Sequence, residues 1–412
     1  MHQDLWTLNR SNIPLIYRLS GREWSCERME EAINDVVSRH KVLRTAFHWD
    51  TDNCWQVVHD ACRVDIGIYD MRDKNKADIQ AVIDNCILHY FDYQKPPLIQ
   101  AVWLRISDEK FILAISLHHL IVDVYASVLF AQEVFARYKG YSLKKGGVLS
   151  EEPSYQFIDY VFDQNKQLEG LVRDHQDYWQ AYLKGHQPMR LPGELDDFCK
   201  GSVSQCVHGF NLLEHAVRQL NASEVMLAWC ISYYLETGQL QALFCMPVSE
   251  RRRGVSDATL GFISGPMPVH FKLDLAESVK SHLRRIKVEQ VASLRRYVPI
   301  GALGLPVTYG VSLNFLDERH YRSSFGPGID SALNTYYSPN AMGLDLFVIC
   351  VKSENHLDLF MHYQSERYAR DVVERFANRF IGVLVALRAG NLGGSLQEWL
   401  CQCSLAKDAP RY

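Results

Sequence analysis

The feature that most constrains this chain is an apolar run, residues 111–115, that leads almost directly into two adjacent histidines, His118 and His119. A run rich in β-branched and aromatic residues that turns abruptly polar is typical of a buried strand that delivers side chains to a cavity at its end. Successive side chains of a strand point to opposite faces. If the strand persists, only one histidine can face the cavity, and the other must face packed protein. The two histidines therefore need different roles.

Asp123 lies four residues after His119, where a helical pattern begins. The apolar residues of this pattern share one face, and Gly140 stands just past its end. They are Tyr125, Val128, Leu129 and Phe135. An aspartate before the first helical turn can accept hydrogen bonds from unpaired backbone amides, so Asp123 is a candidate N-cap. The sequence therefore predicts a strand-to-helix junction that carries both histidines.

Length and composition indicate a globular protein. The chain has 412 residues, of which 47 % are hydrophobic and 11 % aromatic, so it can form one large or two medium globular domains. Its formal net charge is −4 and its pI is near 6.5. A general nucleic-acid binder is usually basic. We therefore expect no nucleic-acid partner.

Cysteine usage and hydropathy indicate the compartment. The eleven cysteines form no CxxC pair and have no regular spacing, so a zinc site is not expected. Three of them, Cys230, Cys245 and Cys350, lie in apolar runs, where a free thiol packs as a small hydrophobic group. The first residues lack the features of a signal peptide, and no run approaches 18 apolar residues. We expect a soluble, cytoplasmic protein with reduced thiols and no membrane partner.

Strands and helices alternate along the chain. Strands are expected at residues 13–19, 43–49, 55–59, 98–106, 111–117, 204–210, 242–247, 267–273, 307–315, 344–352 and 356–363. Helices are expected after Asp123 and at residues 26–40, 76–91, 151–185, 222–236, 275–297 and 367–389. This order favours an α/β fold with two halves of similar length. We place the boundary within residues 186–202.

Four common catalytic signatures are missing from the sequence. It contains no GxxxxGK[ST], no GxGxxG after a strand, no GxSxG and no HExxH. The usual indications of nucleotide, dinucleotide, serine-hydrolase and zinc-protease chemistry are therefore lacking.

The pattern His-His-x-x-x-Asp at a strand-to-helix junction resembles the active-site signature of the condensation domains of nonribosomal peptide synthetases. The chloramphenicol acetyltransferase-like acyltransferases share this signature. Residues 39–47 resemble a second condensation-domain motif, in which a helix ends and the chain enters a strand. Later segments are also similar to motifs of the family, namely residues 178–192, 246–251 and 260–262. The resemblance thus spans nearly the whole chain.

The resemblance implies an α/β fold with two chloramphenicol acetyltransferase-like lobes in a V-shaped pseudo-dimer. Residues 1–185 would form the N-terminal lobe with the histidine motif, residues 203–412 the C-terminal lobe, and residues 186–202 a linker or crossing loop. An active-site tunnel would lie between the lobes. We expect the domain to be free-standing, with carrier and adenylation modules in separate proteins.

The function implied by the resemblance is acyl or aminoacyl transfer from a carrier-protein phosphopantetheine thioester to an amine or hydroxyl acceptor. Such a reaction belongs to nonribosomal peptide or related antibiotic biosynthesis. The acceptor would be a small molecule or would itself be carrier-bound. The carrier protein brings the phosphopantetheine arm, so no permanently bound cofactor is expected. His119 would face the tunnel as general base or would position the nucleophile, and His118 would pack behind it.

Asp123 would form a structural ion pair in this family. A buried carboxylate needs a cation, because an unpaired one is costly. A guanidinium can hold a carboxylate through two hydrogen bonds. Arg44 is the first candidate and Arg39 the second, since both belong to the second motif.

Two positions depart from the family pattern. The signature normally ends in Asp-Gly, whereas Val124 follows Asp123 here, and Ser264 and Gly265 replace a segment that usually contains asparagine. Valine adds two methyl groups where glycine leaves space. We therefore expect Val124 to narrow the substrate tunnel, to which Ser264 and Gly265 also contribute. Two alternatives stay open: a coenzyme A-dependent acyltransferase of the same fold, and a non-catalytic recruitment domain.

The densest basic run is residues 251–253. Such a run is most often a solvated face. Two later arginine pairs, at residues 284–285 and 295–296, lie on one predicted helix. Together these cations could instead attract an acidic carrier-protein helix or a phosphate-bearing arm.

Overall fold

The computed structural model describes residues 12–51, 53–140, 153–193, 203–210, 219–252, 254–305, 310–318, 325, 328–332, 344–354, 356–390 and 392–403, with the backbone alone at 203–210, 331 and 332. The chain forms two compact units. The first comprises Met1–Lys166, Ser249–Ser264 and Tyr321–Ala341, and the second comprises Gln167–Val248, Gly265–His320 and Met342–Tyr412. Each unit has its own α/β core, in agreement with the predicted fold class.

The boundary between the units differs from the one expected at residues 186–202. The first segment of the first unit ends at Lys166, within helix α5 (Phe157–Leu183). Residues 249–264 of the later chain also belong to this unit. Backbone and side-chain bonds from Arg251 and Ile263 to Asp123 hold that segment in the first unit. Local composition cannot reveal contacts between residues that lie more than 120 positions apart. Residues 186–193 are irregular, as expected of a connection, and residues 194–202 lie outside the described residues.

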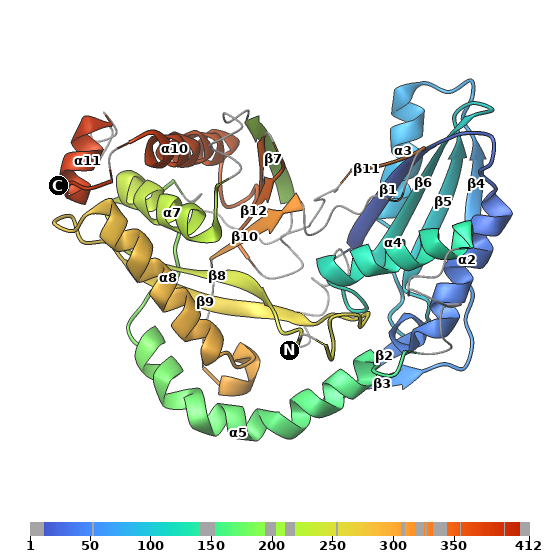
Figure 1. The fold of residues 1–412 in the computed structure, drawn as a ribbon, viewed down its shortest axis with the longest axis horizontal. Helices are drawn as coiled ribbons and strands as arrows, with labels where there is room; N and C mark the ends of the chain where they lie inside the picture. Colours follow the sequence, from blue (N-terminus) through green and yellow to red (C-terminus); the bar gives the residue numbers. More distant parts are fainter. Residues whose placement is uncertain are drawn as a thin grey trace. The chain divides into compact units, whose positions relative to one another are not determined.

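The first unit is built on a five-stranded sheet in the order β11-β1-β6-β5-β4 (Figure 1). The strands are β1 (Asn12–Ser20), β4 (Ile66–Asp70), β5 (Ile99–Arg105), β6 (Lys110–His118) and β11 (Ile329–Ala332). β6 pairs antiparallel with β1 on one side and with β5 on the other. It is therefore the central buried strand that the apolar run at 111–115 predicts.

Helices cover both faces of this sheet. α2 (Cys26–Arg39) and α4 (Val124–Lys139) share one core with alternate residues of the strands, such as Leu113 and Ile115 on β6. α3 (Lys76–Ile87) packs on the opposite face, against Ala114 of β6. The 3-10 turn η1 (Lys41–Arg44) leads from α2 into the hairpin of β2 (Thr45–Trp49) and β3 (Cys54–Val58). The helix after Asp123 is thus fixed by packing on α2 and the sheet.

The second unit contains a six-stranded sheet in the order β7-β13-β12-β10-β8-β9. Its strands are β7 (Val203–Phe210), β8 (Gln241–Ser249), β9 (Ser264–Lys272), β10 (Val311–Asp317), β12 (Leu346–Lys352) and β13 (Leu357–Gln364). Its helices are α7 (Ala222–Thr237), α8 (Val279–Arg295), α10 (Arg370–Ala389) and α11 (Leu396–Gln402), with the turn η2 (Ile300–Leu303). Trp229 of α7 packs against Phe376 and Phe380 of α10, with ring centroids 4.7 and 5.4 Å apart.

All the strands and helices predicted from periodicity are present, with ends shifted by a few residues. Among the described residues, the short elements that were not predicted are β4, β11 and α11. β4 is an edge strand on which Ile68 and Tyr69 are both exposed. Its residues therefore lack the alternation of apolar and polar side chains that identifies a half-buried strand.

Candidate functional site

His118 ends β6 with its side chain fully buried. Its ring lies 4.9 Å from the ring of Tyr93 and 5.9 Å from that of Phe91, measured between centroids. Its Nδ1 accepts a hydrogen bond of 3.1 Å from the backbone N–H of Leu120. In the neutral ring the proton therefore resides on Nε2. The structure places His118 in the packed position that the strand pattern predicts for one histidine of the pair.

His119 lies in the turn after β6 and is partly exposed. Its ring centroid is 4.7 Å from that of Phe262, at an interplanar angle of 58°. Burial of the ring lowers the pKa of His119, against the smaller opposing effects of backbone hydrogen bonds and of the Asp123 charge. The neutral imidazole is therefore the predominant form at neutral pH. A neutral imidazole can accept a proton from a bound group.

Asp123 is the N-cap of α4, as predicted. Its Oδ1 accepts a hydrogen bond of 2.8 Å from the N–H of Ala126. Its Oδ2 accepts one of 3.0 Å from the N–H of Ile263 and one of 2.5 Å from Nη1 of Arg251. The side chains of Asp123 and Arg251 are 5 % and 7 % exposed, so this is a buried ion pair. The carboxylate thus fixes both the start of α4 and the segment that contains Arg251.

Arg251 makes further contacts from the same position. Its Nη2 donates a hydrogen bond of 3.1 Å to the carbonyl of Gly261, and its guanidinium carbon lies 4.8 Å from the ring centroid of Tyr125. Cation–π contact of this kind stabilises a guanidinium that is removed from water. Arg251 therefore ties the loop before Phe262 to the first turn of α4. Because Phe262 contacts the His119 ring, this tie also fixes one wall beside that ring.

The prediction that Arg44 or Arg39 pairs with Asp123 is wrong. Arg44 donates from Nη1 to the backbone carbonyls of His59 and Asp60, which secures the hairpin of β2 and β3. Arg39 pairs with Glu133 on α4, with Nε and Oε2 3.1 Å apart. The second motif therefore fastens α2 and the hairpin around α4 and does not reach the Asp123 carboxylate.

The sequence does carry a signal for the true partner. Arg251 ends the segment 246–251, which resembles a family motif, and also begins the densest basic run. Its neighbour Arg252 does lie on the surface, where it pairs with Asp163 at 3.0 Å. Sequence position alone cannot distinguish the buried arginine from the exposed one, since the two are adjacent.

The remaining predicted site residues flank this cluster. Val124 is the first residue of α4 and is partly exposed, and its carbonyl accepts a hydrogen bond of 2.8 Å from Oγ of Ser127. Ser264 begins β9 directly after Ile263, and Gly265 follows it as the first residue of the next segment of the second unit. A role for these three residues in lining a tunnel stays a prediction.

Gly261 is required by the packing of the Arg251 segment. A Cβ atom at this position would lie 2.2 Å from Cδ2 of Phe157, in the first turn of α5. We expect Gly261→Ala to lower the free energy of unfolding by about 1–3 kcal/mol, the usual cost of overpacking. Urea denaturation measures this change. Gly170→Ala, also next to α5 side chains but with its nearest contact at 3.7 Å, is the control and should be neutral or stabilising. Equal stability of the two variants would contradict the packing described.

Neither a metal cluster nor a membrane span occurs in the part of the chain that the structure describes. No group of three or more His, Cys, Asp and Glu side chains in that part could hold a metal ion. Nor does any helix there have the length and apolarity needed to cross a membrane.

Solved structures of similar proteins share the fold. The X-domain from teicoplanin biosynthesis superposes with a TM-score of 0.78 and 17 % identity, covering 100 % of this chain and 96 % of that one. The starter condensation domain of rhizomide synthetase RzmA superposes with a TM-score of 0.74 and 17 % identity, covering 94 % of this chain and 93 % of that one. The fold is therefore the mixed α/β fold of condensation-domain structures, which is chloramphenicol acetyltransferase-like.

Sequence comparison identifies the family. A family model described as "Condensation domain" matches residues 9–390. Tyrocidine synthase 2 of Brevibacillus parabrevis is 23 % identical over 415 residues, which cover 94 % of this chain and 11 % of that protein. Chondramide synthase cmdD of Chondromyces crocatus is 29 % identical over 188 residues, 44 % of this chain and 5 % of that protein. The chain belongs to the condensation domain family, and its matches span only 11 % and 5 % of the length of these two relatives.

Proposed function

We propose that this chain transfers an acyl or aminoacyl group from a carrier-protein phosphopantetheine thioester to an amine or hydroxyl acceptor. The observation that most supports this proposal is the difference in burial between the two histidines. His118 is fully buried, whereas His119 is partly exposed with its pKa lowered by burial. A neutral ring fixed beside Phe262 suits a group that must receive a proton from an attacking nucleophile.

The proposed chemistry asks little of the protein beyond position and one base. A thioester is already activated, so the acceptor nitrogen or oxygen attacks its carbonyl carbon and the thiolate leaves. The acceptor loses a proton as the new bond forms, and Nε2 of His119 would take it, because Nδ1 is buried. General-base catalysis of this kind contributes roughly 100- to 10,000-fold. Holding the two reactants together in line supplies the rest.

The acyl donor distinguishes this function from that of a coenzyme A-dependent acyltransferase with the same fold. We propose that the donor is the carrier-bound thioester and that the reaction belongs to the biosynthesis of a nonribosomal peptide or a related antibiotic. A cytoplasmic location stays a prediction. The test supplies the same acyl group on a phosphopantetheinylated carrier protein or on coenzyme A, with a small amine or a carrier-bound aminoacyl group as acceptor. We expect transfer from the carrier. Transfer from coenzyme A at an equal rate without carrier would instead identify a coenzyme A-dependent acyltransferase.

The proposal predicts how the reaction depends on pH. The base must be neutral, and burial holds the pKa of His119 below the ordinary value of about 6.5. The value of kcat/KM should therefore fall towards low pH with a midpoint below pH 6.5. Measurement of kcat/KM from pH 5 to 8 tests this, with the residual rate of His119→Ala as the control that lacks the acid limb. An acid limb centred above pH 6.5 would contradict a His119 pKa that burial lowers.

Val124 provides a prediction about the acceptor. If its side chain adjoins the path to His119, Val124→Gly should admit bulkier nucleophiles. The variant should also lose about 1–2 kcal/mol of stability through backbone freedom and lost apolar burial at the start of α4. Rates for a small amine and for a carrier-tethered aminoacyl group are compared in both proteins. An unchanged ratio of these rates would mean that Val124 points away from the acceptor.

A further inference from the structure

The outer face of α8 carries a continuous stripe of exposed side chains. They recur every three or four residues, which places them on one side of the helix. The stripe consists of Lys280, Arg284, Lys287, Val288, Val291, Leu294 and Arg295. From Lys280 to Arg295 it extends about 22 Å at the helical rise of ~1.5 Å per residue. Four cations and three apolar side chains are thus presented together to the surroundings.

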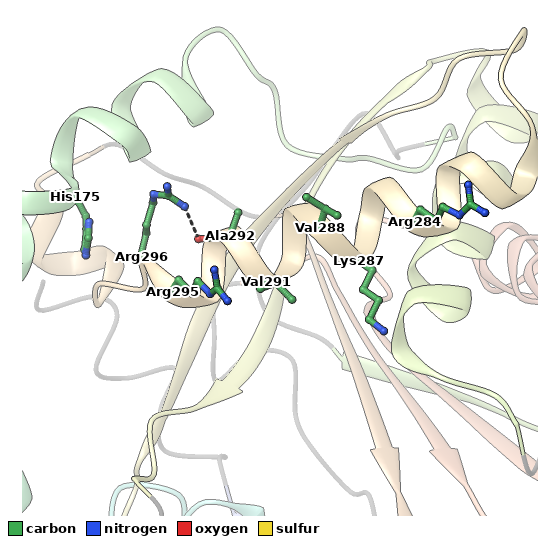
Figure 2. A pocket seen from close by; sticks show the side chains of 8 residues that line it. All are labelled: His175, Arg284, Lys287, Val288, Val291, Ala292, Arg295 and Arg296. Atoms are coloured by element: carbon green, nitrogen blue, oxygen red, sulfur yellow. Dashed lines mark hydrogen bonds between the residues drawn. The ribbon is translucent and has the colours of Figure 1, made fainter.

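The stripe borders a surface groove of about 800 Å³ within the second unit. Figure 2 shows Arg284, Lys287, Val288, Val291 and Arg295 along α8, with Arg296 and Ala292 beside them and His175 of α5 at one end. All the lining residues are basic or apolar. Apolar side chains between cations, along a concave surface, form a surface that is suited to an amphipathic partner.

The charges of the stripe are not neutralised by the described part of the chain. Arg284, Lys287 and Arg295 make no ion pair with a described carboxylate. Their neighbour Arg285 differs, because it pairs with Glu277 at 3.3 Å and its guanidinium carbon lies 4.7 Å from the ring centroid of Phe271. Arg296 also turns inward, donating to the carbonyl of Ala292 and lying over the ring of Tyr178. The outward cations are therefore available to a partner.

The shape and composition of the stripe favour a protein partner over a membrane or a nucleic acid. A flat lipid surface cannot enter a concave groove. Exposed valines have neither a charge nor a hydrogen-bond donor for the phosphates of a nucleic-acid backbone. Like charges spaced along one helix repel one another, so an acidic partner would relieve a cost as well as form pairs. An acidic helix of about four turns matches the stripe, which is about 22 Å long, in length.

We infer that the outer face of α8 is a docking surface for an acidic amphipathic helix of a partner protein, with carboxylates facing Arg284, Lys287 and Arg295 and apolar side chains against Val288 and Val291. This inference rests on the proposed function only in taking the carrier protein as the partner. The docking chemistry itself does not require any acyl transfer.

The first experiment measures binding to the whole chain with a labelled, stapled 16-residue helix that presents glutamates around a leucine stripe. A matched peptide with glutamine in place of glutamate is the ligand control. The triple variant Arg284→Glu, Lys287→Glu, Arg295→Glu should weaken binding of the acidic peptide about tenfold or more in ~0.1 M salt. The triple variant Lys74→Glu, Lys76→Glu, Lys166→Glu makes the same change in net charge at exposed residues of the first unit, and its affinity should stay within about twofold. Val288→Gln with Val291→Gln should also weaken binding while leaving the charges intact.

Equal affinity of the two charge-reversed proteins would overturn the inference. Recruitment to vesicles containing anionic phosphatidylglycerol, lost in the α8 variant, without any binding of the acidic peptide, would also overturn it in favour of a membrane surface. A phosphopantetheinylated, acylated carrier protein then tests the partner. If the α8 variant transfers the acyl group with an unchanged KM for the carrier, the docking inference fails and the proposed function stands. If the acidic peptide binds through α8 but no carrier supports transfer, the proposed function fails, and with it the carrier as occupant.

Discussion

Replacement of His119 by alanine is expected to lower the rate of acyl transfer by about 100-fold or more, with the fold intact. The reason is that His119 is partly exposed beside Phe262 and its imidazole is predominantly neutral, so the ring can take the proton of the acceptor. The single-turnover rate with an acylated carrier gives the catalytic effect, and thermal unfolding shows whether the fold persists. The residual rate would then reflect positioning of the two substrates alone.

His118→Ala is the matched control for this prediction. His118 is fully buried against Tyr93 and accepts a hydrogen bond from the Leu120 amide, so its loss should mainly reduce stability and soluble yield. A His118→Ala protein that folds normally but is inactive, beside a fully active His119→Ala protein, would reverse the roles assigned to the two rings.

Loss of the Arg251 side chain is expected to have the largest effect on stability. Arg251→Ala leaves the carboxylate of Asp123 buried and without its cation, and breaking such a pair typically costs about 3–5 kcal/mol. Equilibrium urea denaturation measures this difference. Arg252→Ala is a control at the next residue: its side chain and that of its partner Asp163 are 45 % and 44 % exposed, so its loss should cost less than about 1 kcal/mol.

A double-mutant cycle tests whether the effect belongs to the pair. Asp123→Asn alone should also destabilise, since it leaves the guanidinium of Arg251 without a counter-charge. Because both single variants remove the same interaction, the double variant Asp123→Asn, Arg251→Ala should be less destabilised than the sum of the two. Strict additivity would contradict a direct bond between these side chains. An Arg44→Ala protein should show no such coupling to Asp123→Asn, because Arg44 bonds to the carbonyls of His59 and Asp60.

The parts of the fold and site that could be predicted are those determined by local periodicity. The apolar run before His118 determines a central strand, and Asp123 and Gly140 mark both ends of α4. The two histidines differ in burial as expected, but β6 ends at His118 and the turn after it, not strand alternation, places His119. These features depend on residues within about thirty positions of one another.

The parts that could not be predicted depend on contacts between distant residues. The bond from Arg251 to Asp123 joins positions 128 residues apart, and it brings a segment of the later chain into the first unit. Arg44 has the chemistry to fill the same role, so residue type gives no reason to prefer one arginine over another. The edge strand β4 lacks a periodic pattern because neither of its faces is fully buried. The partner of Asp123 and the position of β4 are determined by packing in the folded protein.

The most direct test of the proposed function is intact-mass detection of an acylated carrier protein incubated with this chain and an acceptor. The carrier should lose the mass of its acyl group, the acceptor should gain it, and His119→Ala should slow both changes about 100-fold or more. A carrier that keeps its acyl group with every acceptor, together with a pathway output that is unaffected by His119→Ala, would contradict a catalytic role and would indicate a non-catalytic recruitment domain.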